Sequence, residues 1–160
     1  MRVAMQDPLA RTLTPQMCRD GERTPMQWQP GAGAGFTNGS PWLPFGTDVE
    51  TRNVSRQMAD PTSLLHLYRD AIALRRQNPV LHRSSFQALD SGEQVFAFER
   101  RDGDTRVLVA LNFGTTPINP RLPAASVHGG LRTRAQSPLA EDAASLKLGP
   151  CEGAVLLRAC

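Results

Sequence analysis

The chain has 160 residues, a formal net charge of +3 and 40% hydrophobic residues, which is enough for a buried core in one or two small domains. Arginine supplies nearly all of the positive charge, and the basic residues form no patch or tract, so we expect no nucleic-acid partner. No stretch approaches the roughly eighteen apolar residues of a membrane-spanning helix, so we expect no membrane partner either.

Residues 1–58 are rich in Gly, Pro, Thr and Asn and follow neither the period of a helix nor the alternation of a strand, which predicts one long, specifically shaped loop. Residues 19–28 read RDGERTPMQW, and AGF (34–36) and PW (41–42) follow closely. Arginines and an indole in this density suit sugar binding. A guanidinium pairs with hydroxyls or a carboxylate, and a flat ring covers an apolar sugar face.

The spacing of apolar residues predicts one helix over residues 60–78. Asp60 suits its N-cap and Pro61 its first turn, and Asn78-Pro79 ends it because the residue before proline avoids helical geometry. The apolar residues fall on one face of this helix; they are Leu64, Leu67, Tyr68, Ala71, Ile72 and Leu74.

From Ser84 onward the pattern changes to short strands between turn signals, which predicts a small antiparallel sandwich. The Asp-Gly at 102–103 predicts a hairpin between two of the strands. The predicted strands span residues 86–89, 95–100, 106–112, 131–135, 145–148 and 154–158.

The loop and the helix resemble the α-glucosidases and oligo-1,6-glucosidases of the α-amylase superfamily, glycoside hydrolase family 13. That family's pattern R-D-x-x-R-T-P-M-Q-W, then A-G-F, then P-W, stands here in full. The match continues through NV (53–54), DP-x-SLL (60–65) and LRR (74–76) to NP-x-L (78–81), and the resemblance covers about residues 6–112.

The resemblance implies an α+β fragment: the last loop and helix of a TIM-type (β/α)8 barrel, followed by a C-terminal antiparallel β-sandwich domain. The end of the barrel would comprise residues 1–82, with a capping loop over 1–58 and the last helix over 60–78, and the β domain residues 83–160. A complete barrel needs about 250 residues. We therefore expect this chain to be the C-terminal part of a larger enzyme, with the missing N-terminal barrel portion as its partner.

In the resembled family an arginine of this loop closes the bottom of the substrate pocket, where it pairs with an aspartate and contacts the terminal glucose. We expect this role for Arg23, with Arg19 as the alternative, and expect Asp20 to orient one of the two. Trp28 either stacks on a sugar ring or anchors the loop.

Glycoside hydrolysis needs two carboxylic acids beside the scissile bond. In the resembled family these acids belong to other motifs, including an N-H-D triplet, and no His-Asp pair occurs in this chain. We therefore expect no catalytic residue here and no activity of the chain alone. Asp20 and Glu22 lie close in sequence within the loop, but we do not expect them to act as the catalytic pair.

The implied function is that of a retaining α-glucosidase acting on terminal α-linked glucose of short oligosaccharides or of sucrose. A sucrose isomerase or trehalose synthase is the alternative within the superfamily. Residues 84–160 alone also permit a non-enzymatic sugar-binding or interaction module. The sequence has no metal-ligand cluster and no phosphate-binding loop, so we expect no metal and no cofactor.

The cysteines indicate a reducing compartment. Their number is odd and no C-x-x-C spacing occurs, so a zinc site or a disulfide framework is not expected; they are Cys18, Cys151 and Cys160. A bridge between the last two is the alternative. We expect a cytoplasmic protein, with the periplasm as the alternative.

Overall fold

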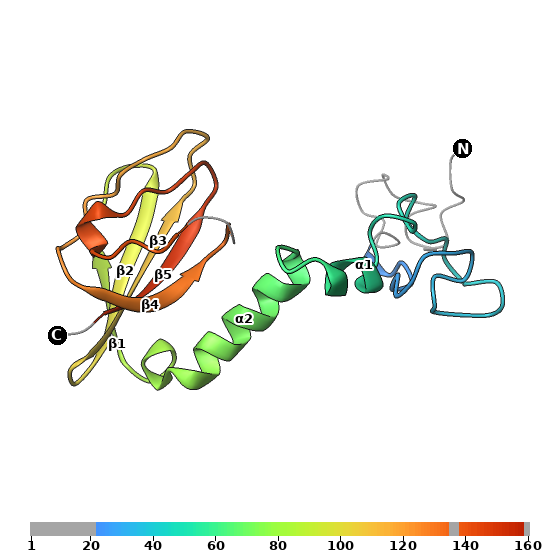
Figure 1. Cartoon of the computed structure of the whole chain (residues 1–160), viewed down its shortest axis with the longest axis horizontal. Helices are drawn as coiled ribbons and strands as arrows, with labels where there is room; N and C mark the ends of the chain where they lie inside the picture. The colour runs from blue at the N-terminus through green and yellow to red at the C-terminus, as the bar shows by residue number, and fades with distance from the viewer. Residues whose placement is uncertain (1–21, 135–137, 159–160) are drawn as a thin grey trace, which may run out of the picture. The chain divides into compact units, whose positions relative to one another are not determined.

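A computed structural model describes residues 22–134 and 138–158 of the chain. The chain forms two compact units, of which the first ends at Leu65 and the second begins at His66. Their helices and strands are labelled in Figure 1. The division between the units falls close to the start of a helix, whereas the sequence predicted a domain boundary after residue 82. That boundary stays a prediction.

The described part of the first unit is mostly irregular, but it contains a short helix, α1 (Val54–Ala59), that was not predicted. Asn53, which is 2% exposed, caps this helix because its side-chain oxygen accepts a hydrogen bond from the Arg56 amide at 2.9 Å. The Asn53 side-chain amide donates to the Val49 carbonyl at 2.8 Å. A buried cap of this kind fixes where α1 begins, although α1 itself has no buried residue.

The glycine-rich stretch of the first unit closes into a tight turn. The Ala34 carbonyl accepts hydrogen bonds from the amides of Trp28 and Gln29, at 2.8 and 3.0 Å. Ala34 and Gly35 have φ angles of 50° and 65°, in the left-handed region, and Ala34 is buried. The amide of Gly31 is held by Glu50 Oε1 at 3.0 Å. The turn therefore fixes the backbone at Trp28.

Helix α2 spans Leu64–Gln77, so the predicted helix over 60–78 begins later than expected. Asp60 Oδ1 accepts hydrogen bonds from the amide and the hydroxyl of Thr62, at 2.8 and 2.7 Å, and so closes a turn instead of capping a helix. An N-terminal amide of α2, that of Leu65, donates to Gln57 Oε1 of α1 at 3.1 Å. The end before Asn78-Pro79 is as predicted.

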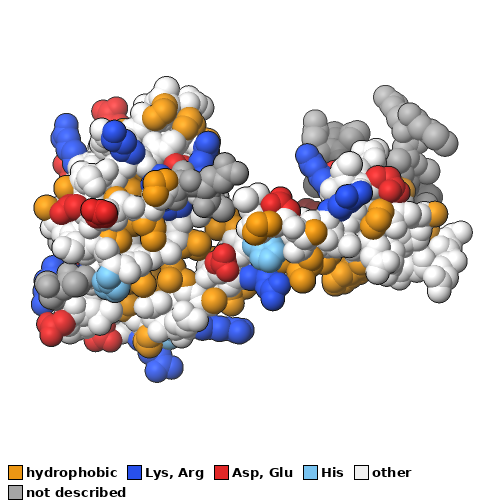
Figure 2. Space-filling model, viewed as in Figure 1, with side chains coloured by type: hydrophobic (Ala, Val, Ile, Leu, Met, Phe, Trp, Pro, Cys, Tyr) orange, Lys and Arg blue, Asp and Glu red, His pale blue; other side chains and the backbone are white. Residues whose placement is uncertain are grey.

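The apolar face predicted for α2 is uncovered. No residue of α2 is buried, and Leu64, Tyr68 and Ile72 are 64%, 64% and 49% exposed. Figure 2 shows hydrophobic side chains that reach the surface beside charged ones. Because most helical stability in proteins comes from packing an apolar face, this face requires a cover that the described residues do not supply.

The second unit contains the predicted antiparallel β domain, which is confirmed. Its five strands pair in the order β1-β2-β3-β5-β4, and every pairing is antiparallel. The β2–β3 hairpin turns at Gly103, whose φ is 57°. The strands are β1 (Ser85–Leu89), β2 (Val95–Asp102), β3 (Thr105–Asn112), β4 (Val127–Arg132) and β5 (Gly153–Arg158).

Two weaker strand predictions need correction. The strand predicted over residues 131–135 is β4, which ends at Arg132. The strand predicted over 145–148 is instead the short 3-10 helix η4 (Ala143–Ser145) followed by an isolated bridge between Leu148 and Ile118. The Asp142 side chain caps η4 by accepting from the Ala144 amide at 2.7 Å, a local bond that favours a turn over a strand.

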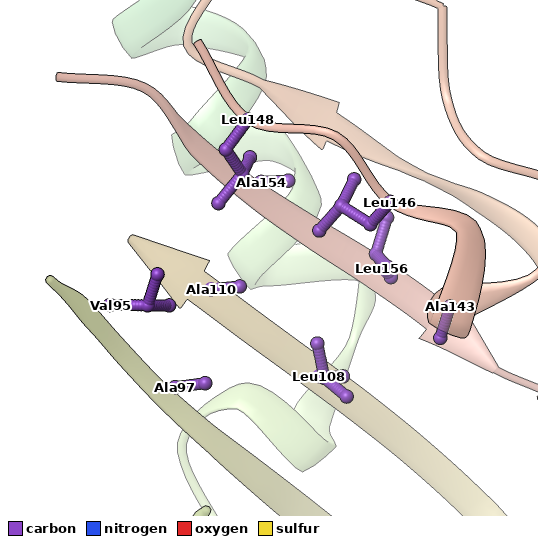
Figure 3. Close-up of a cluster of buried hydrophobic side chains, with 9 residues drawn as sticks. All are labelled: Val95, Ala97, Leu108, Ala110, Ala143, Leu146, Leu148, Ala154 and Leu156. Atoms are coloured by element: carbon purple, nitrogen blue, oxygen red, sulfur yellow. The ribbon is translucent and has the colours of Figure 1, made fainter. Parts of the chain in front are cut away.

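The sheet is packed on both faces. On one face the buried side chains of β2, β3 and β5 meet Ala143, Leu146 and Leu148, as Figure 3 shows. These three residues belong to the irregular segment before β5, residues 138–152. On the other face Val80, from the 3-10 helix η3 (Pro79–Leu81) that follows α2, packs against Val107 and Val109. The irregular segment therefore serves as the second layer of the domain.

A buried ion pair fastens this segment to the sheet. The Nε of Arg132 donates to Glu152 Oε1 at 2.9 Å, and the two side chains are 8% and 2% exposed. The guanidinium also donates to the carbonyls of Pro138 and Lys147, and Glu152 Oε2 accepts from the Gly149 amide at 2.6 Å. Both charges thus have further hydrogen-bond partners, which offsets much of their desolvation cost.

Asn112, at the end of β3, completes this fastening. Its side-chain amide donates to the carbonyls of Thr116 and Gly149 at 2.9 and 2.7 Å. Its side-chain oxygen accepts from the Gly114 amide at 2.8 Å. Asn112 is 2% exposed, so these bonds satisfy a side chain that would otherwise be costly to bury.

We expect Glu152→Ala to destabilise the β domain by about 3–5 kcal/mol, because it leaves the Arg132 charge buried and unpaired. Urea unfolding followed by circular dichroism measures the loss. Glu141→Ala, which removes an exposed carboxylate, is the matched control and should change stability by about 0.5 kcal/mol or less. Equal losses in the two variants would contradict the role of the ion pair.

We also expect Gly33→Ala to disrupt the turn around Ala34, because a Cβ on Gly33 would collide with the Thr37 carbonyl. Gly39→Ala is the control, since its Cβ would lie 3.9 Å from Thr37 Oγ1. The turn holds Trp28, so near-ultraviolet circular dichroism should change in the first variant and not in the second. An unchanged spectrum in both variants would show that the turn does not order this indole.

Candidate functional site

The Gln27 side chain anchors residues 23–28 of the first unit, which we call the motif segment. Its Nε2 donates to the Arg52 carbonyl at 2.5 Å and lies 3.4 Å from Asp48 Oδ1. Gly46 leaves room for this side chain, because a Cβ there would lie 2.8 Å from Gln27 Oε1. The amide of Gln27 therefore fills a space that a larger residue at position 46 would close.

Backbone bonds hold the same segment against α1. The Gln27 carbonyl accepts from the Val54 amide and the Trp28 carbonyl accepts from the Ser55 amide, each at 2.9 Å. These two amides belong to the first turn of α1 and have no partner within the helix. The motif segment thus supplies acceptors that α1 needs, and α1 in turn fixes the path of the motif.

A hollow of about 330 Å³ adjoins this anchor. Its lining is mixed: backbone and side chains of the motif form one part, and polar residues before and within α1 form the rest. The lining residues are Thr24, Pro25, Met26, Gln27, Gly46, Asp48, Arg52, Asn53, Val54 and Gln57. The amides and hydroxyl of this lining are groups that hydrogen-bond to hydroxyl-rich ligands.

Of the binding residues predicted from the sequence, the structure describes Arg23 and Trp28. Arg23 is exposed and lies just before the anchored segment. Trp28 is 48% exposed, and its backbone is held by the Ala34 turn and by α1. Arg19 and Asp20 lie outside the described residues.

Other aromatic side chains of the loop are also accessible. Trp42 is 66% exposed, and Phe36 makes an edge-on contact with Phe45 at a centroid distance of 6.3 Å. Leu43, next to Trp42 in the chain, is 2% exposed. The aromatic pair therefore packs locally, whereas the Trp42 ring is exposed.

Two charged residues that line the hollow, Asp48 and Arg52, form an ion pair at the surface. Arg52 Nε lies 3.3 Å from Asp48 Oδ2, with side chains 81% and 38% exposed, so this pair contributes little to stability. Among the described residues, no three His, Cys, Asp or Glu side chains gather as metal ligands would. Cys151 has a free, exposed thiol; Cys18 and Cys160 lie outside the described residues. None of the described helices has the length and apolar character to cross a membrane.

Sequence reasoning missed the residues that position the motif. Gln27 is part of the motif, but its partners Asp48 and Arg52 follow more than twenty residues later in the chain. The N-cap pattern of Asn53 before Val54 was a signal for α1. At six residues, α1 is too short to show a helical period of apolar residues.

Two family models match the chain. Residues 2–84 match the α-amylase catalytic domain, and residues 87–131 match the α-amylase C-terminal all-β domain. The first match covers more than half of the chain. It includes the motif segment, α1, α2 and η3, and the second includes most of the sheet.

Curated relatives are similar to the same region. Glucan 1,6-alpha-glucosidase of Streptococcus pneumoniae is 43% identical over 94 residues, which cover 59% of this chain and 18% of that protein. Oligo-1,6-glucosidase of Parageobacillus thermoglucosidasius is 36% identical over 107 residues, covering 66% of this chain and 19% of that protein. The chain thus spans less than a quarter of the length of these relatives.

Solved structures extend the similarity to the β domain. The trehalulose synthase MutB from Pseudomonas mesoacidophila matches 88% of this chain and 26% of that chain, with a TM-score of 0.77 and 32% identity. Isomaltulose synthase from Klebsiella gives a TM-score of 0.78 at 32% identity, with the same coverage. From the loop motif, the antiparallel domain and these matches together, the chain belongs to the α-amylase family of glycoside hydrolases.

Proposed function

We propose that this chain is the C-terminal part of a retaining α-glucosidase that removes terminal α-linked glucose from short oligosaccharides or sucrose. The observation that carries the proposal is the motif segment of residues 23–28, which Gln27 anchors beside a polar hollow. Glucan 1,6-alpha-glucosidase and oligo-1,6-glucosidase are similar to this chain over the region that includes it.

The uncovered apolar face of α2 supports the view that a further part of the enzyme packs on this helix. Leu64, Tyr68 and Ile72 expose large apolar surfaces that a complete domain would bury. The matched relatives are about five times longer than the region they share with this chain. The N-terminal barrel portion of the enzyme is the partner we propose for this face.

In the complete enzyme the reaction would proceed by double displacement. One carboxylate attacks the anomeric carbon and forms a covalent glucosyl-enzyme, and a second carboxyl group protonates the leaving oxygen and then activates water. We assign neither carboxylate to a residue of this chain. Its contribution is substrate binding: Arg23, or alternatively Arg19, pairs with a carboxylate and with glucose hydroxyls, and Asp20 orients the arginine. Trp28 supports the segment or stacks on the sugar.

Sucrose isomerisation is the second candidate function. It is favoured by the trehalulose and isomaltulose synthases among the similar structures. Both reactions begin at a terminal glucosyl unit, and water or the released fructose then decides the product. A non-enzymatic β module does not account for residues 2–84, which match a catalytic domain.

We place this enzyme in the cytoplasm. The support is the free, exposed thiol of Cys151, which a reducing compartment preserves. The substrate is a small α-glucoside.

We expect the purified chain to release no p-nitrophenol from p-nitrophenyl α-glucoside above the buffer blank, because both catalytic carboxylates belong to the missing portion. A turnover that disappears in Asp20→Asn or Glu22→Gln would overturn both the fragment assignment and the site assignment. The same assay on a mixture with the N-terminal portion of a relative tests whether activity can be restored.

We expect activity in a chimaera in which this chain replaces the matching C-terminal segment of the Parageobacillus oligo-1,6-glucosidase. In that chimaera Arg23→Ala should lower kcat/KM by a factor on the order of 10²–10³, because a donor to the sugar and its partner carboxylate is lost. Arg23→Lys should not rescue, since an ammonium lacks the planar fork of donors.

Two further variants make this kinetic experiment decisive. Arg19→Ala should lose less if Arg23 contacts the sugar, and the reverse order of losses would assign the contact to Arg19. Arg56→Ala removes an exposed arginine of α1 and serves as the matched control. Near-normal kinetics for Arg23→Ala with a collapsed melting temperature would make this arginine a structural residue.

A further inference from the structure

Three arginines lie side by side on one face of the sheet, on the neighbouring strands β2, β3 and β5. Arg101 of β2 is the register partner of Arg106 in β3, and Arg106 is the register partner of Arg158 in β5. Directly paired residues of antiparallel strands project from the same face with their Cβ atoms about 5 Å apart. We call these three residues the arginine row. Like charges in this arrangement repel one another and arginine does not deprotonate.

One carboxylate serves two members of the row. Glu99 Oε1 lies 3.5 Å from Arg106 Nη1, and Glu99 Oε2 lies 3.5 Å from Arg158 Nη1. Both distances exceed the usual 2.7–2.9 Å of a charge-assisted hydrogen bond. The pair with Arg158 is screened from water, because the Arg158 and Glu99 side chains are 5% and 13% exposed, whereas the Arg106 side chain is 31% exposed. The row and Glu99 together carry a formal excess of two positive charges.

The row also has unused hydrogen-bond donors. The Nε atoms of Arg106 and Arg158 are buried and have no hydrogen-bond partner among the described residues. Buried donors in folded proteins almost always have an acceptor, and these two belong to neighbouring residues of one row. Glu99 is already shared between their Nη1 atoms, so the part of the chain that the structure describes supplies no acceptor for the Nε atoms.

We propose that the arginine row is a binding site for a phosphate group, either inorganic phosphate or a phosphomonoester. A phosphate dianion matches the formal charge excess of the row. Its several acceptor oxygens suit donors that diverge from two guanidinium groups on adjacent strands. The site lies in the β domain and does not depend on the proposed glucosidase function.

The test is an NMR titration of the ¹⁵N-labelled full chain at constant ionic strength, with sodium phosphate or phenyl phosphate replacing sodium chloride. The Nε–H signals of the row report directly on the proposed contacts. We expect saturable shifts of these signals with a Kd on the order of 1 mM or below. Shifts with both probes support a site that also accepts esters, and shifts with inorganic phosphate alone support a site for the free ion.

Variants separate a built site from a general salt effect. Arg106→Gln should weaken binding about tenfold or more, because it removes donors to the anion. Arg121→Gln changes the net charge equally at an exposed position outside the row and should bind like the unaltered chain. Glu99→Gln should bind more tightly, by about threefold or more, because it removes the competing negative charge.

The proposal is overturned if the Nε–H signals show no saturable shift, or if Arg106→Gln responds as the unaltered chain does. If Arg106→Gln fails to fold, the Glu99→Gln variant decides. Unchanged or weaker binding in that variant would contradict a site in which Glu99 competes with the anion.

Discussion

The buried ion pair between Arg132 of β4 and Glu152, just before β5, holds the covering segment on the sheet, because both side chains also bond to the backbone of that segment. A sheet of five strands buries one face only if something covers it, and here the cover is an irregular segment with little regular hydrogen bonding of its own. Arg132, Glu152 and Asn112 supply the missing bonds by holding carbonyls and amides of that segment. Leu146 and Leu148 can then pack on the sheet.

The arginine row shows the opposite balance within the same sheet. The Arg132 guanidinium has a carboxylate and two carbonyls as acceptors. Arg106 and Arg158 share one carboxylate at longer distances, and the described residues give their Nε atoms no acceptor. The Arg132 and Arg158 side chains are similarly buried, at 8% and 5% exposed, so burial alone does not explain the difference. The proposed phosphate group would remove this difference, since an added acceptor would give the row the full set of partners that Arg132 already has.

The first unit and α2 follow a different principle. Their local structure is fixed by polar contacts: Gln27 to the Arg52 carbonyl, Asn53 to the first turn of α1, and Gln57 to the first turn of α2. Their apolar side chains remain largely exposed, as Leu64 and Tyr68 show.

The sequence by itself determined the family, the antiparallel β domain and the end of α2, because an ordered motif, alternating apolar residues and Asn78-Pro79 are local signals. It also identified the apolar face of α2, but not that this face is uncovered. Only the tertiary structure decided the start of α2, the fate of residues 145–148 and the partners of Gln27 and Glu99. These depend on residues distant in the chain, such as Arg52 for Gln27 and Arg158 for Glu99. A pattern read along the sequence cannot give such pairings, since they follow from strand register and from competition between local caps and longer elements.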